Sequence, residues 1–177
     1  MSTLITLVGQ QPGAVAVTAK TLLKQDTHHG LDRVILLYTD QTKTEAERLC
    51  HYLKELKSDL IVDLQAIALD PEAAAPERLA WNIIREKLKC GGLSEPVCYD
   101  TSPGLNYQVA LISYHLRDER RLKPLYVDFN YLYRLEDGHS WELLDIGLKT
   151  LLDLHSLRIN QAVNVADTGV DNLEIIL

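Results

Sequence analysis

The chain has 177 residues, of which 46% are hydrophobic and 24% charged, and its formal net charge is −7. This composition is typical of one globular domain and excludes a collagen-like, low-complexity or disordered chain. The negative charge argues against a protein that binds duplex nucleic acid through a broad basic face. A small anionic ligand stays possible, because backbone N–H groups at helix N-termini bind phosphates without many lysines.

The sequence shows no membrane span and no metal-binding pattern. No apolar run approaches the roughly 18 residues that a span needs, and the N-terminus lacks the basic flank of a signal peptide. The cysteines, Cys50, Cys90 and Cys98, have no metal-ligand spacing and are predicted to be reduced thiols. We therefore expect a cytoplasmic protein with no membrane partner, no metal and no cofactor.

Strands and helices alternate through the first two thirds of the chain. Apolar, β-branched runs such as Leu4–Val8 predict buried strands, and Pro12 suits the first turn of a helix. Thr42 and Glu45 have the spacing of a capping box, which predicts a helix start at Thr42. In chain order, the predicted strands cover 4–8, 33–38, 61–67 and 96–99, and the predicted helices cover 12–24, 42–57, 76–89 and 107–116.

The remaining third is richer in predicted strands. Strands are expected over 125–129, 131–135 and 140–146, followed by a helix over 149–157 and a terminal strand over 173–177. The whole pattern predicts an α/β fold with a doubly wound, Rossmann-like, mostly parallel sheet and a β-rich C-terminal extension. We expect one domain over 1–157 and a tail over 158–177 that forms an edge strand or a dimer contact.

Two loops stand where such a sheet binds ligands. In the common strand order, the first strand lies between the second and the fourth, and ligands bind beyond the carboxyl ends at this reversal. The loops are Gly9–Gly13 (GQQPG) and Thr101–Asn106 (TSPGLN), both small or polar and both followed by a helix. They suit a phosphate or nucleotide. The alternative is a pair of ordinary strand–helix turns, in which the same residue types are common.

Other nucleotide motifs are weak. The dinucleotide fingerprint G-x-G-x-x-G is absent after the first strand, although Asp40 follows the second strand. A nucleotide-cofactor enzyme on a Rossmann-like fold is therefore disfavoured but stays an alternative. The chain contains no Walker A motif, no G-x-S-x-G elbow and no H-E-x-x-H motif.

Longer segments resemble one family. An N-terminal strand, then GQQP, a helix and RVILLYTDQTKTEAERL together resemble the CRISPR-associated Rossmann-fold (CARF) domain, closest to the branch fused to a restriction-like nuclease. DTSPGLNYQVALISY matches the family's strand-4 loop and ligand-binding helix, and PLYVDFNYLYRL fits its fifth and sixth strands. The resemblance covers roughly residues 3 to 157. The family's loop is often T-G-G-T-K, whereas this one has no lysine, which leaves the ring size of the ligand open.

The resemblance implies a homodimer that binds a cyclic oligoadenylate, the second messenger of type III CRISPR antiviral defence. A four-fold or a six-fold ring matches a two-fold protein axis, and of these cyclic tetra-adenylate is favoured. A chain of 177 residues has no room for an appended nuclease. We therefore expect a ring nuclease that cleaves the messenger without metal, by attack of a ribose 2′-OH, and ends the response. The alternative is a non-catalytic sensor domain that regulates an effector, either natural or excised from a longer effector.

The same resemblance suggests which residues act. The catalytic candidates are Gln10, Ser102 and Asn106, as donors near the ribose and phosphate. No histidine is placed as a general base, so any cleavage should be slow. The predicted ligand-binding residues are Gly9, Gln10, Gln11, Pro12, Thr39, Asp40, Thr42, Lys43, Thr101, Ser102, Pro103, Gly104, Leu105 and Asn106.

Overall fold

The computed structural model describes residues 2–25, 30–70, 72–103, 106–128 and 130–155, with only the backbone for Gln25 and Asn106. The predicted tail over 158–177, its terminal strand and the end of the helix predicted over 149–157 lie outside the described residues. The predicted ligand residues Gly104 and Leu105 also lie outside them.

One seven-stranded sheet organises the chain, in the order β3-β2-β1-β4-β5-β6-β7. Strands β1 to β5 are parallel, and β6 and β7 continue the sheet in antiparallel fashion. The strands are β1 (Ser2–Leu7), β2 (Leu31–Tyr38), β3 (Ile61–Ala66), β4 (Val97–Asp100), β5 (Leu122–Asp128), β6 (Tyr131–Arg134) and β7 (Ser140–Glu142). The helices are α1 (Pro12–Gln25), α2 (Lys43–Leu56), α3 (Ala80–Lys89), α4 (Asn106–Leu116) and α5 (Leu148–Leu154), with 3₁₀ turns at Asp40–Thr42 and Pro76–Arg78.

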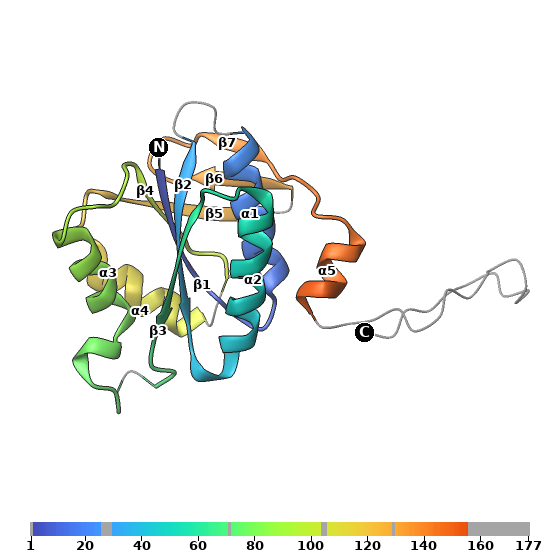
Figure 1. Ribbon diagram of the computed structural model, residues 1–177. Helices are drawn as coiled ribbons and strands as arrows, with labels where there is room; N and C mark the ends of the chain where they lie inside the picture. Colours follow the sequence, from blue (N-terminus) through green and yellow to red (C-terminus); the bar gives the residue numbers. More distant parts are fainter. Residues whose placement is uncertain (1, 26–29, 71, 104–105, 129, 156–177) are drawn as a thin grey trace, which may run out of the picture.

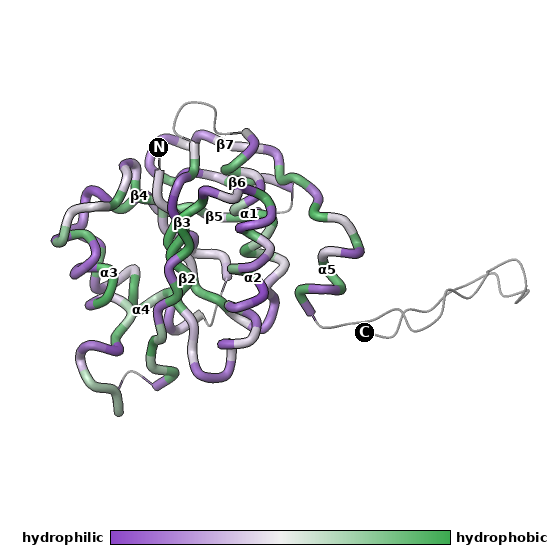
Figure 2. Tube along the Cα trace, viewed as in Figure 1, coloured by the Kyte–Doolittle hydropathy of each residue, from purple (hydrophilic) through white to green (hydrophobic). Residues whose placement is uncertain are grey.

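This order confirms the predicted doubly wound fold with β1 between β2 and β4. Helices α1 and α2 cover one face of the sheet, and α3 and α4 cover the other (Figure 1). Alternate residues of β1 therefore enter different cores: Leu4 packs on the side of α1 and α2, and Ile5 on the side of α3 and α4. Because helices cover both faces, the middle of β2, Val34–Leu37, is buried and continuously hydrophobic (Figure 2).

The helix predicted to begin at Pro76 begins at Ala80 instead. Pro76–Arg78 forms a 3₁₀ turn, and Leu79 is extended, with φ −79° and ψ 125°. The turn is fastened to the loop after β3, because the Ala68 N–H donates to the Arg78 carbonyl at 2.9 Å. This backbone contact interrupts the amphipathic pattern that predicted one continuous helix.

The capping box predicted from Thr42 and Glu45 is wrong. The Thr42 hydroxyl accepts from the N–H of Thr39 at 3.1 Å, and the Thr42 N–H donates to the Thr39 carbonyl at 2.9 Å. Thr42 therefore closes the turn that precedes α2, and its side chain does not cap the helix that follows. This turn fixes the exit of β2.

The largest differences in strand boundaries are the start of β5 and the end of β7. Strand β5 begins at Leu122, before Pro124, whose carbonyl accepts from the Leu135 N–H at 2.9 Å. The strand predicted over 140–146 ends at Glu142, because the chain then turns toward α1: the Leu144 N–H donates to the Thr21 hydroxyl at 3.1 Å. No helix within the described ranges is long and apolar enough to cross a membrane.

Candidate functional site

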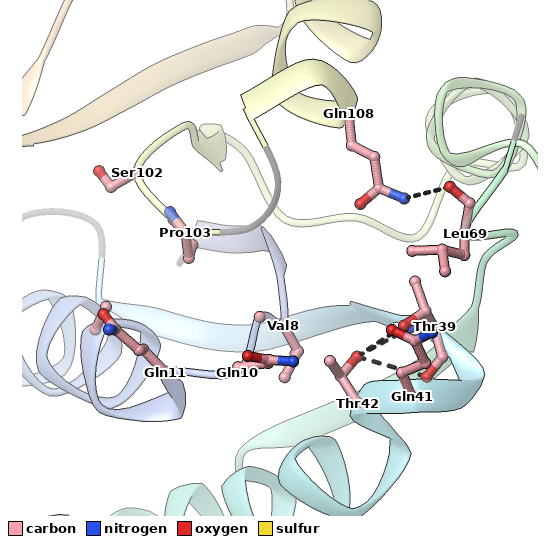
Figure 3. A pocket seen from close by; sticks show the side chains of 12 residues that line it. Val8, Gln10, Gln11, Thr39, Gln41, Thr42, Leu69, Ser102, Pro103 and Gln108 are labelled. Carbon is pink, nitrogen blue, oxygen red and sulfur yellow. Dashed lines mark hydrogen bonds between the residues drawn. The ribbon is translucent and has the colours of Figure 1, made fainter. Parts of the chain in front are cut away.

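A cavity of about 400 Å³ lies at the carboxyl ends of β1 to β4. The loops that leave these four strands and the first turn of α4 surround it (Figure 3). Parallel strands bring their carboxyl ends to one edge of the sheet, so segments far apart in the sequence meet there. The lining residues are Val8, Gly9, Gln10, Gln11, Ala14, Thr39, Gln41, Thr42, Leu69, Ser102, Pro103 and Gln108.

The structure brings seven of the predicted ligand-binding residues together in this cavity. They come from three different loops and are Gly9, Gln10, Gln11, Thr39, Thr42, Ser102 and Pro103. Gln10 and Gln11 are exposed, whereas Thr39 and Thr42 are buried and hydrogen-bonded to each other. The glutamines therefore have freedom to meet a ligand, while the threonines shape the wall behind them.

Other predicted residues do not line the cavity. Pro12 is buried at the start of α1, and the Thr101 hydroxyl donates to the Leu125 carbonyl at 2.7 Å. Asp40 pairs with Arg78 at 3.3 Å, and the exposed Lys43 ammonium lies 3.9 Å from the Glu47 carboxylate. Local partners thus hold the side chains of Thr101, Asp40 and Lys43 elsewhere. Asn106 begins α4, and its side chain lies outside the described atoms.

The sequence prediction missed five lining residues: Val8, Ala14, Gln41, Leu69 and Gln108. Gln41 had a signal, since it stands between two predicted residues in the loop after the second strand. No sequence signal of comparable strength pointed to Leu69 or Gln108. Their place depends on how the loop after β3 packs against the first turn of α4.

A buried carboxyl holds the loop after β4 in place. Asp100 is 0% exposed, and its Oδ1 accepts from the Ser102 N–H at 2.9 Å. The Ser102 hydroxyl accepts from the Val127 N–H at 2.7 Å and points away from Gln108 and Thr42 (Figure 3). Burial raises the pKa of Asp100, and hydrogen bonds from the Ser102 N–H and hydroxyl act in the opposite direction. Asp100 and Ser102 thus join the loop to β5.

The described lining of the cavity carries no charged and no titratable side chain. Its polar groups are four glutamine amides, two threonine hydroxyls and one serine hydroxyl, set among the apolar Val8, Ala14, Leu69 and Pro103. Amides offer both donors and acceptors, which suits the edge of a nucleobase. In the described part of the chain, no three His, Cys, Asp or Glu side chains cluster as they would to hold a metal ion.

Comparison with models of protein families gave no match, and comparison with curated proteins gave none either. Solved structures do match. The chain superposes on protein VC1899 from Vibrio cholerae with a TM-score of 0.67 and 18% identity, over 86% of this chain and 39% of that one. It also superposes on Can2 from Sulfobacillus thermosulfidooxidans, which was solved in complex with cyclic tetra-adenylate. This match has a TM-score of 0.60 and 17% identity, over 87% of this chain and 41% of Can2.

At 17% and 18% identity, these matches show the fold and do not show the ligand or the activity of this chain. The chain spans about two fifths of both matched proteins, at 39% and 41% of their lengths. The doubly wound, Rossmann-like α/β fold that the sequence predicted is thereby confirmed.

Proposed function

We propose that this chain binds a cyclic oligoadenylate in the cavity at the carboxyl ends of β1 to β4. The observation that carries the proposal is the character of that cavity, which is uncharged and rich in amides. It lies at the edge where doubly wound sheets bind nucleotides. Support comes from the shared fold with Can2, which was solved with cyclic tetra-adenylate.

The proposed assembly is a homodimer that shares one ring of cyclic tetra-adenylate. A cavity of about 400 Å³ lies at the small end of ligand pockets, and a ring of four nucleotides is larger than this. Two copies related by a two-fold axis would present two such cavities to equivalent halves of the ring. Native mass spectrometry with and without ligand tests this part of the proposal: two chains per ring are expected, and a complex of one chain with one ring would contradict it.

The proposed reaction is cleavage of the ring by its own ribose. The 2′-oxygen attacks the adjacent phosphorus, the bond from phosphorus to the 5′-oxygen breaks, and the 2′-OH proton ends on that leaving oxygen. The products are a 2′,3′-cyclic phosphate and a free 5′-hydroxyl. The protein's part is to align the three atoms and stabilise charge on the phosphate oxygens, which the side chains of Gln10, Ser102 and Asn106 are proposed to do.

Binding without cleavage is the second candidate function, and one observation favours it. The described lining has no titratable side chain that could accept the 2′-OH proton, and the Ser102 hydroxyl is already used in the loop. A sensor needs only affinity and a response to the ligand. Cleavage in such a cavity would be slow, because alignment alone has to lower the barrier.

One assay separates these candidates. Pure protein is incubated with radiolabelled cyclic tetra-adenylate in EDTA, and the products are resolved by chromatography. A linear product that ends in a cyclic phosphate supports cleavage, whereas tight retention of the intact ring supports sensing. If the protein binds no cyclic oligoadenylate of any ring size, both candidates are wrong.

The loop after β4 is tested by Ser102→Ala. Loss of the hydroxyl removes the acceptor for the Val127 N–H, so the loop should loosen and affinity for cyclic tetra-adenylate should fall about tenfold. Asn106→Ala tests the start of α4 in the same way. Ser113→Ala, on the exposed surface of α4, is the control and should bind like the parent protein. Unchanged binding in both test variants would remove this loop from the site.

A further inference from the structure

Gln108 differs from the other three glutamines of the cavity because its side chain is buried and already hydrogen-bonded. Its exposed fraction is 6%, whereas Gln10, Gln11 and Gln41 are exposed. It belongs to the first turn of α4 and reaches the loop after β3. A buried amide with fixed partners presents a ligand with a group of defined direction, which the exposed glutamines do not.

The contacts of Gln108 decide which end of its amide faces the cavity. The Nε2 group donates to the carbonyl of Ala68 at 3.3 Å and to the carbonyl of Leu69 at 3.4 Å. The reversed orientation would place the amide oxygen against two carbonyl oxygens, where it finds no donor. Tyr107 strengthens this junction, since its hydroxyl also donates to the Leu69 carbonyl. The NH₂ group is thus committed to the protein.

The amide oxygen of Gln108 is left for a ligand. It points away from Leu69 in Figure 3, and it has no hydrogen-bond partner among the described residues. An acceptor held in this way favours a donor, which the amine of a nucleobase or a ribose hydroxyl brings and a phosphate oxygen does not. Because the apolar Val8 and Leu69 line the same cavity, this end suits a nucleobase, and phosphates are expected nearer the loop of Gly9 and Gln10.

We infer that Gln108 selects adenine by accepting a hydrogen bond from its exocyclic amine. The inference rests on the proposed function and names the residue that reads the base. Adenine carries an amine at C6, where guanine carries a carbonyl oxygen that would face the Gln108 oxygen. Leu69 and Val8 line the same cavity and offer apolar surface for the faces of a purine. Gln108 is thus a specificity-determining residue of the site.

The test compares two rings that differ only at C6. One is cyclic tetra-adenylate, and the other is the same ring with unsubstituted purine in place of adenine, which keeps the ring nitrogens and lacks the amine. Binding of each to the full chain is measured by isothermal titration calorimetry. We expect the purine ring to bind about tenfold to a hundredfold more weakly, because the Gln108 oxygen is then covered by the base and left without a donor.

Gln108→Met separates recognition from a structural role. Methionine has nearly the same shape but no acceptor, so the affinity ratio of the two rings should fall to within about threefold. A merely structural loss would weaken both rings and keep the ratio. Gln65→Met is the matched control: it makes the same change on β3, outside the cavity lining, and should keep the parent ratio.

The outcomes distinguish this inference from the proposed function. Equal binding of both rings by the parent protein, or an unchanged ratio in Gln108→Met, overturns the role of Gln108 and leaves ring binding intact. Failure of the parent protein to bind either ring overturns the proposed function and the inference with it. Equal binding of the two rings by the parent protein overturns the role of Gln108 even if Gln108→Met does not fold.

Discussion

Two of the cavities that the described residues form differ in character, and the larger of these two is the poorer candidate for a site. The first, at the carboxyl ends of the strands, has about 400 Å³ and an uncharged lining. The second has about 660 Å³ and lies between α2 and α5. Its lining is Thr44, Glu47, Arg48, His51, Tyr52, Glu55, Thr150, Asp153 and Leu154.

The difference lies in how the polar groups are held. In the second cavity, polar side chains lie in solvent and contact one another: His51 Nε2 and Glu55 Oε1 are 3.0 Å apart, with side chains 81% and 65% exposed. In the first, Gln108 and Thr42 are buried, and backbone contacts set their direction. Binding loses less entropy when the polar groups of a site are already held in place, so cavity volume alone does not identify a site.

The largest expected effect on ligand binding comes from filling each cavity in turn with a tryptophan side chain. Ala14→Trp places a bulky side chain in the first cavity and should weaken binding of cyclic tetra-adenylate by up to about a hundredfold. Thr44→Trp makes the matched change at an exposed first-turn position of α2, in the second cavity, and should leave binding unchanged. The ligand would belong to the second cavity if Thr44→Trp abolished binding and Ala14→Trp did not. Fluorescence anisotropy measures both.

The next effect concerns the wall of the first cavity. Asp100→Ala removes the acceptor for the Ser102 N–H and leaves that part-buried group without its partner, so the free energy of unfolding should fall by about 1–3 kcal/mol. Urea denaturation measures it. Asp153→Ala, in the second cavity, is the comparison and should change stability less, because it borders open solvent. Equal losses would contradict the distinction between the two cavities.

A subtler change is the pH dependence of stability. Burial raises the pKa of Asp100 above its ordinary value of 3.8, so the folded state holds the proton more tightly than the unfolded chain. The stability from this group is full below that ordinary value and is lost as pH rises through the folded pKa. Asp100→Asn cannot ionise, so its stability relative to the parent should increase with pH across this window. A difference that stays constant from pH 3 to neutrality, in urea melts, contradicts the burial effect.

The smallest expected effect is on salt dependence. The described lining has no lysine or arginine, so few counterions should be released on binding of the ring. We expect the logarithm of the association constant to fall with the logarithm of salt concentration with a slope shallower than about −1. A slope near −3 would mean that cations outside this lining hold the phosphates. Titrations between low and moderate salt measure it.

Much of the fold could be predicted from the sequence, and the candidate site only in part. Apolar runs and helical stripes predicted every strand and helix of the parallel core, because burial imposes those periods directly on the sequence. The start of α3 was mistaken, since the backbone contact of Ala68 with Arg78 joins residues that no local pattern connects. Side-chain directions in the loops were harder still: Thr101 and Ser102 are adjacent, yet only Ser102 lines the cavity.

The sequence by itself determined the alternation of strands and helices, and with it the edge of the sheet where the loops of Gly9 and Ser102 meet. Tertiary structure alone decided which side chains face the cavity. It turned Asp40 toward Arg78 and Thr101 toward Leu125, and it brought Gln108 in from α4. The physical reason is the distance along the chain over which each property is set. Strand and helix periods follow from burial over a few neighbouring residues, whereas the direction of a polar side chain is set by hydrogen-bond partners that only the folded chain brings near.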